Sequence, residues 1–207
     1  HCFTEPNKAL GYFKQVIKKY PKNSKPYYYM GDYMLCIKAD TKAAVKYYQK
    51  AYKITKKNKL DYDDSVKEVL FNLLYALNQL GKQKKVLKYI EEAKEYLRKH
   101  YGGTEGWLKD PSHRKTRLSY LAAWYYFAKD YDKAKDYMKR MKDASNCASC
   151  THSECIEYCI LEGLILELKK DDLHALEKYE RVLKLYPHSL IHQYLVNQIR
   201  KKVGNKG

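Results

Sequence analysis

The sequence predicts an all-α chain of stacked antiparallel helix pairs, and three observations support this prediction. A stripe made of a small residue, a bulky residue four positions later and an apolar residue three positions after that recurs along the chain. A helix that is apolar over more than one face precedes four of the five stripes. A break separates each such helix from its stripe. Recurrence of this kind is typical of helical repeats, because each hairpin buries its faces against its neighbours.

The five stripes begin at intervals of 35, 42, 48 and 41 residues, within the range expected of helical repeats. Helical spacing places the three members of each stripe on one face of a helix. The stripes are Ala9, Phe13 and Val16; Ala44, Tyr48 and Ala51; Val86, Ile90 and Ala93; Ala134, Met138 and Met141; and Ala175, Tyr179 and Val182.

The partner helices share one position, which lies 13 residues before the second stripe and 12 residues before each later one. It is occupied by Gly31, Leu74, Ala122 and Gly163. Glycine lowers helix propensity, so we expect close helix crossings at Gly31 and Gly163. The breaks that follow are Ala39-Asp40, Gly81-Lys82, Lys129-Asp130 and Lys170-Asp171. The predicted unit is therefore a helical hairpin with a tight turn.

This alternation resembles the tetratricopeptide repeat, in which small and aromatic residues of a first helix meet Ala and aromatic positions of a second, with Pro at the exit. The resemblance covers about residues 7–189 and implies a right-handed superhelix of stacked antiparallel helix pairs, a tetratricopeptide-like α-solenoid. Leu74, Met138 and Met141 depart from the pattern. The best matches are Gly31 with Ala44, Tyr48 and Ala51, and Gly163 with Ala175, Tyr179 and Pro187.

We expect one repeat domain over residues 1–207. Its units are a half repeat at 4–23, repeats at 24–58, 61–100, 112–145 and 153–188, and a capping helix at 189–202. Because the chain begins without Met and its first helix lacks the partner that its stripe expects, we also expect a processed or trimmed chain. In the long linker 101–114, Trp107 is expected to plug a gap between repeats, with a mobile contact as the alternative.

The net charge of +17 suggests a polyanionic partner, but its distribution matters more than its total. The lysine clusters fall in the second helices of the hairpins, as in "VKYYQKAYKITKKNK". The family resemblance implies that these helices form the convex side. A basic convex surface that binds RNA or another polyanion is one interpretation, and an ordinary solvated surface is the other.

The first helices of the hairpins should line the concave face, and their expected groove positions are mostly aromatic or amide. This pattern favours a non-enzymatic scaffold, adaptor or sensor module that binds a protein or peptide segment. For any single tyrosine, packing between helices is the alternative. The candidate groove residues are Tyr28, Tyr29, Asp32, Phe71, Asn72, Tyr75, Asn78, Gln79, Tyr120, Tyr126 and Phe127.

Four clustered cysteines, Cys147, Cys150, Cys155 and Cys159, are a weak candidate for a zinc site. Their spacing departs from the usual two-knuckle arrangement, so free thiols are favoured over local disulfides or metal, and we predict no metal. Six cysteines without a clear disulfide framework favour a reducing compartment such as the cytoplasm.

The sequence contains no recognisable catalytic motif. It contains no glycine-rich phosphate loop, no helical pair of metal-ligating histidines and no nucleophile with an evident base. We therefore expect neither an enzyme nor a cofactor. No apolar stretch is long enough to predict a membrane span.

Overall fold

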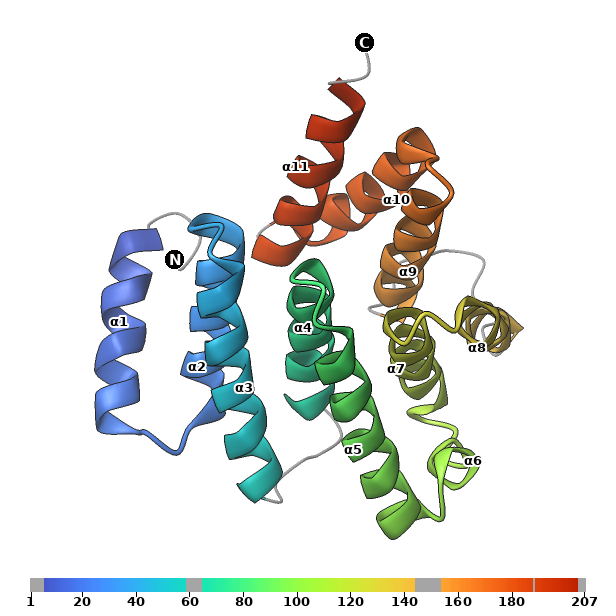
Figure 1. Ribbon diagram of the computed structural model, residues 1–207, viewed down its shortest axis with the longest axis horizontal. Coiled ribbons are helices and arrows are strands. Elements are labelled where there is room, and N and C mark those ends of the chain that lie inside the picture. The colour runs from blue at the N-terminus through green and yellow to red at the C-terminus, as the bar shows by residue number, and fades with distance from the viewer. Residues whose placement is uncertain (1–5, 59–64, 144–153, 188, 205–207) are drawn as a thin grey trace. The chain divides into compact units, whose positions relative to one another are not determined.

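The computed structural model describes residues 6–58, 65–143, 154–187 and 189–204, and every regular element within them is a helix (Figure 1). The chain divides into two compact units, residues 1–89 and 90–207, and the division falls within α5 (Gln83–Tyr101). The predicted all-α helical-repeat fold is confirmed. The expected single domain and right-handed superhelical path stay predictions.

The first unit stacks a half repeat, a complete hairpin and the first helix of the next hairpin. In Figure 1 the first three of its α-helices lie side by side, and the third also packs on the fourth. In the half repeat, Ala9 and Phe13 of the first stripe are buried with Met30. The elements are α1 (Pro6–Lys19), α2 (Ser24–Asp32), the π-helix η1 (Tyr33–Ile37), α3 (Thr41–Asn58), α4 (Ser65–Gln79) and the start of α5.

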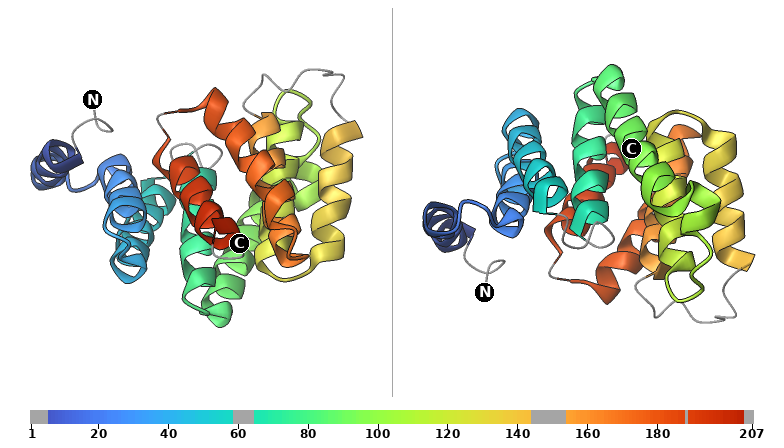
Figure 2. Two further views of the ribbon diagram at one scale, coloured as in Figure 1. Left: turned by 90° about the horizontal axis from the view of Figure 1, so that it is seen from above. Right: turned by 90° about the horizontal axis from the view of Figure 1, so that it is seen from below.

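The second unit contains the rest of α5, a short helix in the linker, two hairpins and the C-terminal helix. Both views of Figure 2 show the last hairpin as a neighbouring pair, and the C-terminal helix packs on its second member. The elements are α6 (Thr104–Trp107), α7 (Arg114–Phe127), α8 (Tyr131–Asp143), α9 (Glu154–Leu168), α10 (Asp172–Leu185) and α11 (Leu190–Gly204).

The four hairpin turns share one backbone conformation, and all four coincide with the predicted breaks. Each turn contains a residue with positive φ, which ends the first helix in the left-handed region. Three of these residues are not glycine, so each accepts a local backbone cost of about 1 kcal/mol. The residues are Ala39 (φ 53°), Gly81 (φ 65°), Lys129 (φ 67°) and Lys170 (φ 62°).

The stripe after each turn begins at the same place. Five residues beyond the positive-φ residue, the backbone N–H of the stripe's first member donates to the carbonyl just after the turn, at 2.9 to 3.1 Å in all four cases. In three turns this carbonyl belongs to an aspartate whose side chain also accepts a backbone N–H as a helix cap. The repeat is therefore preserved at the level of individual hydrogen bonds.

Gly31 and Gly163 lie where two helices cross closely, as predicted. A Cβ on Gly31 would lie 2.3 Å from a ring carbon of Tyr48, and one on Gly163 would lie 2.5 Å from a ring carbon of Tyr179. Both tyrosines are buried members of their stripes. The missing side chain thus makes room for the ring of the partner helix.

The π-helix η1 explains why the first complete hairpin is one residue longer than the others. Its widened turn is closed by a hydrogen bond from Lys38 N to Tyr33 O, five residues back. As a result, the turn bond from Asp40 N reaches Met34 O, six residues back, whereas the other three turns span five. The extra residue is accommodated within η1, before the turn, so α3 packs on α2 in the same register as α10 packs on α9.

Candidate functional site

A buried hydrogen-bond network joins α2, α3 and α4 in the first unit. The Tyr48 hydroxyl donates to Asp32 Oδ1 over 2.7 Å, and Asn72 Nδ2 donates to the same oxygen over 2.9 Å. Asn72 Nδ2 also donates to the Tyr28 hydroxyl over 3.1 Å. Three predicted groove residues, Tyr28, Asp32 and Asn72, therefore meet at one place, which Tyr48 anchors from the second helix.

In this network the buried carboxylate of Asp32 accepts hydrogen bonds from two donors, Tyr48 and Asn72. Burial, and then the charge of Asp32, raise the pKa of the Tyr48 hydroxyl well above its ordinary value. The same two causes, in the same order, raise the pKa of the Cys36 thiol. Both groups keep their protons at neutral pH, and a buried carboxylate requires such donors. The network can fix the positions of helices but offers no mobile proton.

A row of aromatic rings leads from this network to solvent. The Tyr28 ring lies 6.1 Å from Tyr48 and 5.4 Å from Tyr29, and Tyr29 stacks on Phe13 of α1 at 5.6 Å. Tyr29 is 43% exposed, and Tyr12, which contacts Phe13, is 62% exposed. The sequence analysis missed Tyr12, because α1 is half a repeat and its spacing does not indicate which flank stays uncovered.

The predicted groove residues of α4 divide between core and surface. Tyr75 is buried, and its hydroxyl accepts a hydrogen bond from Gln79 Nε2 at 3.0 Å. Phe71 is half-buried, whereas Asn78 and Gln79 are exposed. We use the term α2/α4 surface for the accessible members of the two helices, which are Tyr28, Tyr29, Phe71, Asn78 and Gln79.

The three candidates of the second unit, Tyr120, Tyr126 and Phe127, are buried in α7. The Tyr126 hydroxyl donates to the backbone carbonyl of Leu164 in α9 at 3.3 Å, and its ring packs edge-on against Phe127. Burial, and then the charge of Glu167, raise the pKa of Tyr126. These side chains hold α7 to its neighbours, so we leave them out of the proposed binding surface.

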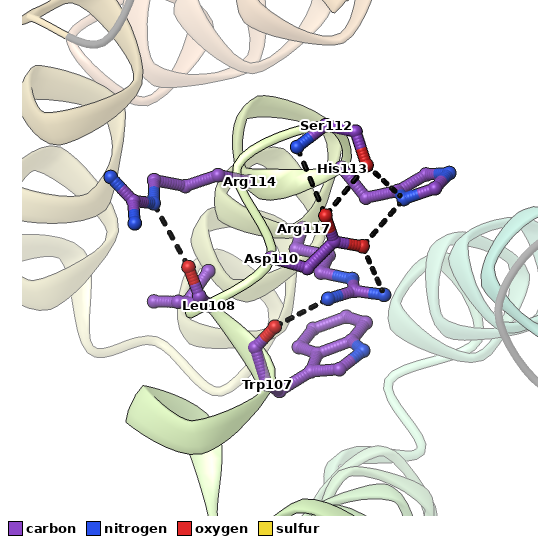
Figure 3. Close-up of polar contacts among 7 residues, drawn as sticks. All are labelled: Trp107, Leu108, Asp110, Ser112, His113, Arg114 and Arg117. Carbon is purple, nitrogen blue, oxygen red and sulfur yellow. Dashed lines mark hydrogen bonds and ion pairs between the residues drawn. The ribbon is translucent and has the colours of Figure 1, made fainter.

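The linker before α7 forms a compact polar cluster that the sequence analysis did not find (Figure 3). Trp107 is buried and lies parallel to Trp124 of α7 at 6.1 Å, so it is packed in the core, and its role as a plug between repeats stays a prediction. The buried Arg117 guanidinium lies 5.4 Å from the Trp107 ring and donates to the Trp107 carbonyl. It also pairs with Asp110 at 3.4 Å. An arginine in an apolar helix is the only sequence signal for this contact.

Asp110, Ser112 and His113 are the residue types of a hydrolase triad, but their geometry is not that of a triad. In a triad, one imidazole nitrogen faces the hydroxyl and the other faces the acid. Here a single nitrogen, His113 Nδ1, lies 3.0 Å from Ser112 Oγ and 2.8 Å from Asp110 Oδ2. The hydroxyl donates directly to Asp110 Oδ1 at 2.6 Å. Hydrogen bonds from Ser112 and then His113 lower the pKa of Asp110, and the cluster closes the loop.

The candidate zinc cysteines lie mostly outside the described side chains. This applies to Cys147, Cys150 and Cys155, whereas Cys159 is buried in α9. Among the described residues, no group of three or more His, Cys, Asp or Glu side chains is placed to hold a metal ion. The prediction about this cluster therefore stays a prediction.

Comparison with known proteins adds one match. The family model described as "Tetratricopeptide repeat" matches residues 4–23, the segment predicted as a half repeat and containing all of α1. A comparison with curated proteins gave no match. Within the described parts of the chain, none of the helices combines the length and the apolar character that a bilayer crossing requires.

Proposed function

We propose that this chain, whose residues 4–23 match the tetratricopeptide repeat model, is a protein-interaction module of that family and binds a peptide segment of a partner protein on the α2/α4 surface. The observation that carries the proposal is the network of Tyr28, Asp32 and Asn72, which joins α2 to α4 next to the exposed ring of Tyr29. A rigid ring at a solvent-exposed position is a typical contact for a protein partner.

The side chains of the α2/α4 surface suit an extended or helical peptide. The exposed ring of Tyr29 stacks on Phe13 and contacts Tyr28. Because these contacts already restrict the side chain, it loses little conformational entropy on binding. Asn78 and Gln79 carry amides that can donate to and accept from a peptide backbone. Aromatic contact would therefore supply affinity, and amide pairing would set the peptide's position.

We propose a scaffold or adaptor role rather than a catalytic one. The family is typically non-catalytic. In the triad-like set of the linker, Ser112 and Asp110 share one nitrogen of His113, which is not the arrangement of a catalytic triad. Peptide capture by a preformed surface needs neither a nucleophile nor a cofactor.

The test is to select peptides on the intact chain from a random phage library and to measure their affinities by fluorescence anisotropy. Tyr29→Ala should weaken binding at least tenfold, which corresponds to about 1.4 kcal/mol. Tyr186→Ala is the matched control, because Tyr186 is 42% exposed but lies in the second unit. Affinity within twofold of wild type for Tyr29→Ala, or an equal loss for Tyr186→Ala, would contradict the proposal.

A further inference from the structure

The outward face of α3 carries a continuous row of cations. Lys42, Lys46, Lys50, Lys53 and Lys57 follow one another at steps of four, four, three and four residues, so they lie along one stripe of the helix. All five are exposed. Within the described part of the chain, no ion pair joins any of them to an acid.

This helix differs from the other second helices of the hairpins. Its 18 residues include six lysines and no aspartate or glutamate. Each of the others alternates cations with acids, as ordinary solvated helices do. The acids are Glu91, Glu92 and Glu95 in α5; Asp132, Asp136 and Asp143 in α8; and Asp172, Glu177 and Glu180 in α10.

The start of α5 extends the same basic region. Gln49 Nε2 of α3 donates to the Tyr89 hydroxyl at 3.1 Å, and the rings of Tyr52 and Tyr89 meet edge to face at 5.3 Å. These contacts hold α3 against the segment of α5 that contains the exposed Lys84, Lys85 and Lys88. The basic face comprises Lys42, Lys46, Lys50, Lys53, Lys57, Lys84, Lys85 and Lys88.

Such a face is unfavourable for the isolated protein. Like charges at spacings of three and four residues repel one another along the helix, and Lys42 adds a cation at the positive end of the helix dipole. The buried stripe of Ala44, Tyr48 and Ala51 on the opposite side keeps α3 in place. A bound polyanion would relieve the repulsion, so the charge pattern is complementary to a ligand.

The geometry points to a linear ligand. Five lysines in a row span about 22 Å with about 6 Å between neighbours, from the helical rise of about 1.5 Å per residue. The exposed face of α3 presents no large apolar side chain among its described residues, and the adjoining segment Lys84–Lys88 of α5 exposes a single one, Leu87, whereas membrane-surface helices carry a whole apolar face. Lysines act as point charges on flexible stems, which suits successive phosphates but does not distinguish bases. We propose that the basic face binds the phosphate backbone of a nucleic acid without reading its sequence.

The experiment uses the intact chain and two unrelated 20-nucleotide RNA strands labelled with fluorescein, with anisotropy measured at several salt concentrations. The variant Lys46→Glu with Lys53→Glu places an acid three or four residues from Lys42, Lys50 and Lys57. It should therefore melt no lower than wild type. Its affinity for both strands should fall at least tenfold, and the slope of log affinity against log salt should become shallower by about 1.4 for two lost contacts.

The matched control is Lys169→Glu with Lys201→Glu, which removes two exposed lysines of the second unit and changes the net charge equally. An equal loss of affinity in this control, or an unchanged salt slope in the α3 variant, would overturn the proposal. So would tighter binding to polyglutamate of equal charge or to vesicles containing phosphatidylserine. Peptide selection and Tyr29→Ala test the α2/α4 surface separately, so the two proposals can fail independently.

Discussion

The hairpins α2–α3 and α9–α10 use the same contact for different purposes. In both, a glycine admits the ring of a buried tyrosine, whose hydroxyl donates over 2.7 Å to an acid of the first helix. In the first unit the acid is the buried Asp32, which accepts a second hydrogen bond from Asn72 of α4. In the second it is Glu167, which is partly exposed and pairs with Lys202 of α11.

This difference shows how one repeat contact can be adapted to its neighbour. A buried acid that meets an amide fixes α2 and α4 in register and supports the α2/α4 surface. A partly exposed acid that meets a lysine fastens a terminal helix through a pair that water and salt weaken. We therefore expect mutations of the glycine–tyrosine contact to destabilise both units alike. Mutations of the groups that bind the acid should differ in their effect between the two units.

The largest effect should come from breaking the shared contact. Gly31→Ala and Gly163→Ala each place a Cβ within 2.5 Å of a tyrosine ring that is buried and hydrogen-bonded. We expect each to lower the free energy of unfolding by about 3 kcal/mol, as overpacked core sites do. Circular dichroism in urea measures the loss. Tryptophan fluorescence follows the second unit alone, because Trp107 and Trp124 both lie there.

Gly11→Ala is the control for this first prediction. Gly11 lies in α1 with nothing within 4 Å of an added Cβ, so alanine should stabilise the helix by up to about 1 kcal/mol. Wild-type stability of either buried-site variant would show that the crossing is looser than described.

The second prediction compares the energetic importance of the hydrogen bonds to Asp32 and to Glu167. Tyr48→Phe removes a donor from a buried carboxylate and should cost about 2 kcal/mol. Tyr179→Phe should cost about 1 kcal/mol, because solvent and Lys202 still reach Glu167. Urea midpoints of the two variants check the order. Equal losses would mean that the burial of Asp32 has no energetic consequence.

The third prediction concerns the acid sensitivity that a buried histidine, His192, gives to the second unit. Burial lowers the pKa of His192 to about 4, from an ordinary value of 6.5, and its Nδ1 is buried without a partner among the described residues. Between these values the unfolded chain binds more protons than the folded one, so stability is complete above pH 6.5 and falls as the pH falls towards 4. At about 1.4 kcal/mol per pKa unit, this shift corresponds to a loss of about 3 kcal/mol from this group by pH 4.

His192→Phe should abolish this part of the acid sensitivity. The measurement is the urea midpoint followed by tryptophan fluorescence, which should fall less in the variant than in wild type between neutral and mildly acidic pH. The raised pKa of His174, caused by its hydrogen bond to Asp171, acts in the opposite direction and remains in both proteins. The described part of the first unit contains no histidine and provides an internal reference. An unchanged pH profile in the variant would refute the assignment.

The smallest effect should follow from Lys202→Ala. Its side chain is 53% exposed, and exposed ion pairs contribute little, so a loss of about 0.5 kcal/mol is expected, shrinking further in high salt. Asn72→Ala is the counterpart in the first unit and should cost more, because it leaves the buried Asp32 one donor short. The pair is compared by urea denaturation at low and high salt, and a reversed order would contradict the comparison.

The hairpins are predictable because their signals are local. Ala44, Tyr48 and Ala51 fall on one helical face and are fully buried together, and each break coincides with a positive-φ residue. The sequence analysis found the extra residue of the first hairpin only as a spacing of 13 against 12. Nothing in "YMLCI" itself indicates a π-turn.

The candidate site was predictable only in part, because periodicity reveals which residues share a face but not what covers that face. Tyr28 and Asp32 lie on α2 and Asn72 lies on α4, the next first helix, and stacking of the two helices brings these side chains together. Tyr126 obeys the same pattern, yet α9 covers it. Tyr12 is exposed in a half repeat, and the Trp107–Arg117 contact depends on a loop path that helical spacing does not describe.

The π-helix η1 has a consequence for how this chain can change over evolution. An extra residue in an α-helix turns everything beyond it by about 100°, which would normally rotate the following stripe out of the core. Here the widened turn confines that rotation to Tyr33–Ile37, so Gly31 and Tyr48 still meet although 17 positions separate them, against 16 between Gly163 and Tyr179. The first hairpin thus accommodates one additional residue just before its turn. The same place would accept a one-residue deletion that returns the hairpin to the common repeat length.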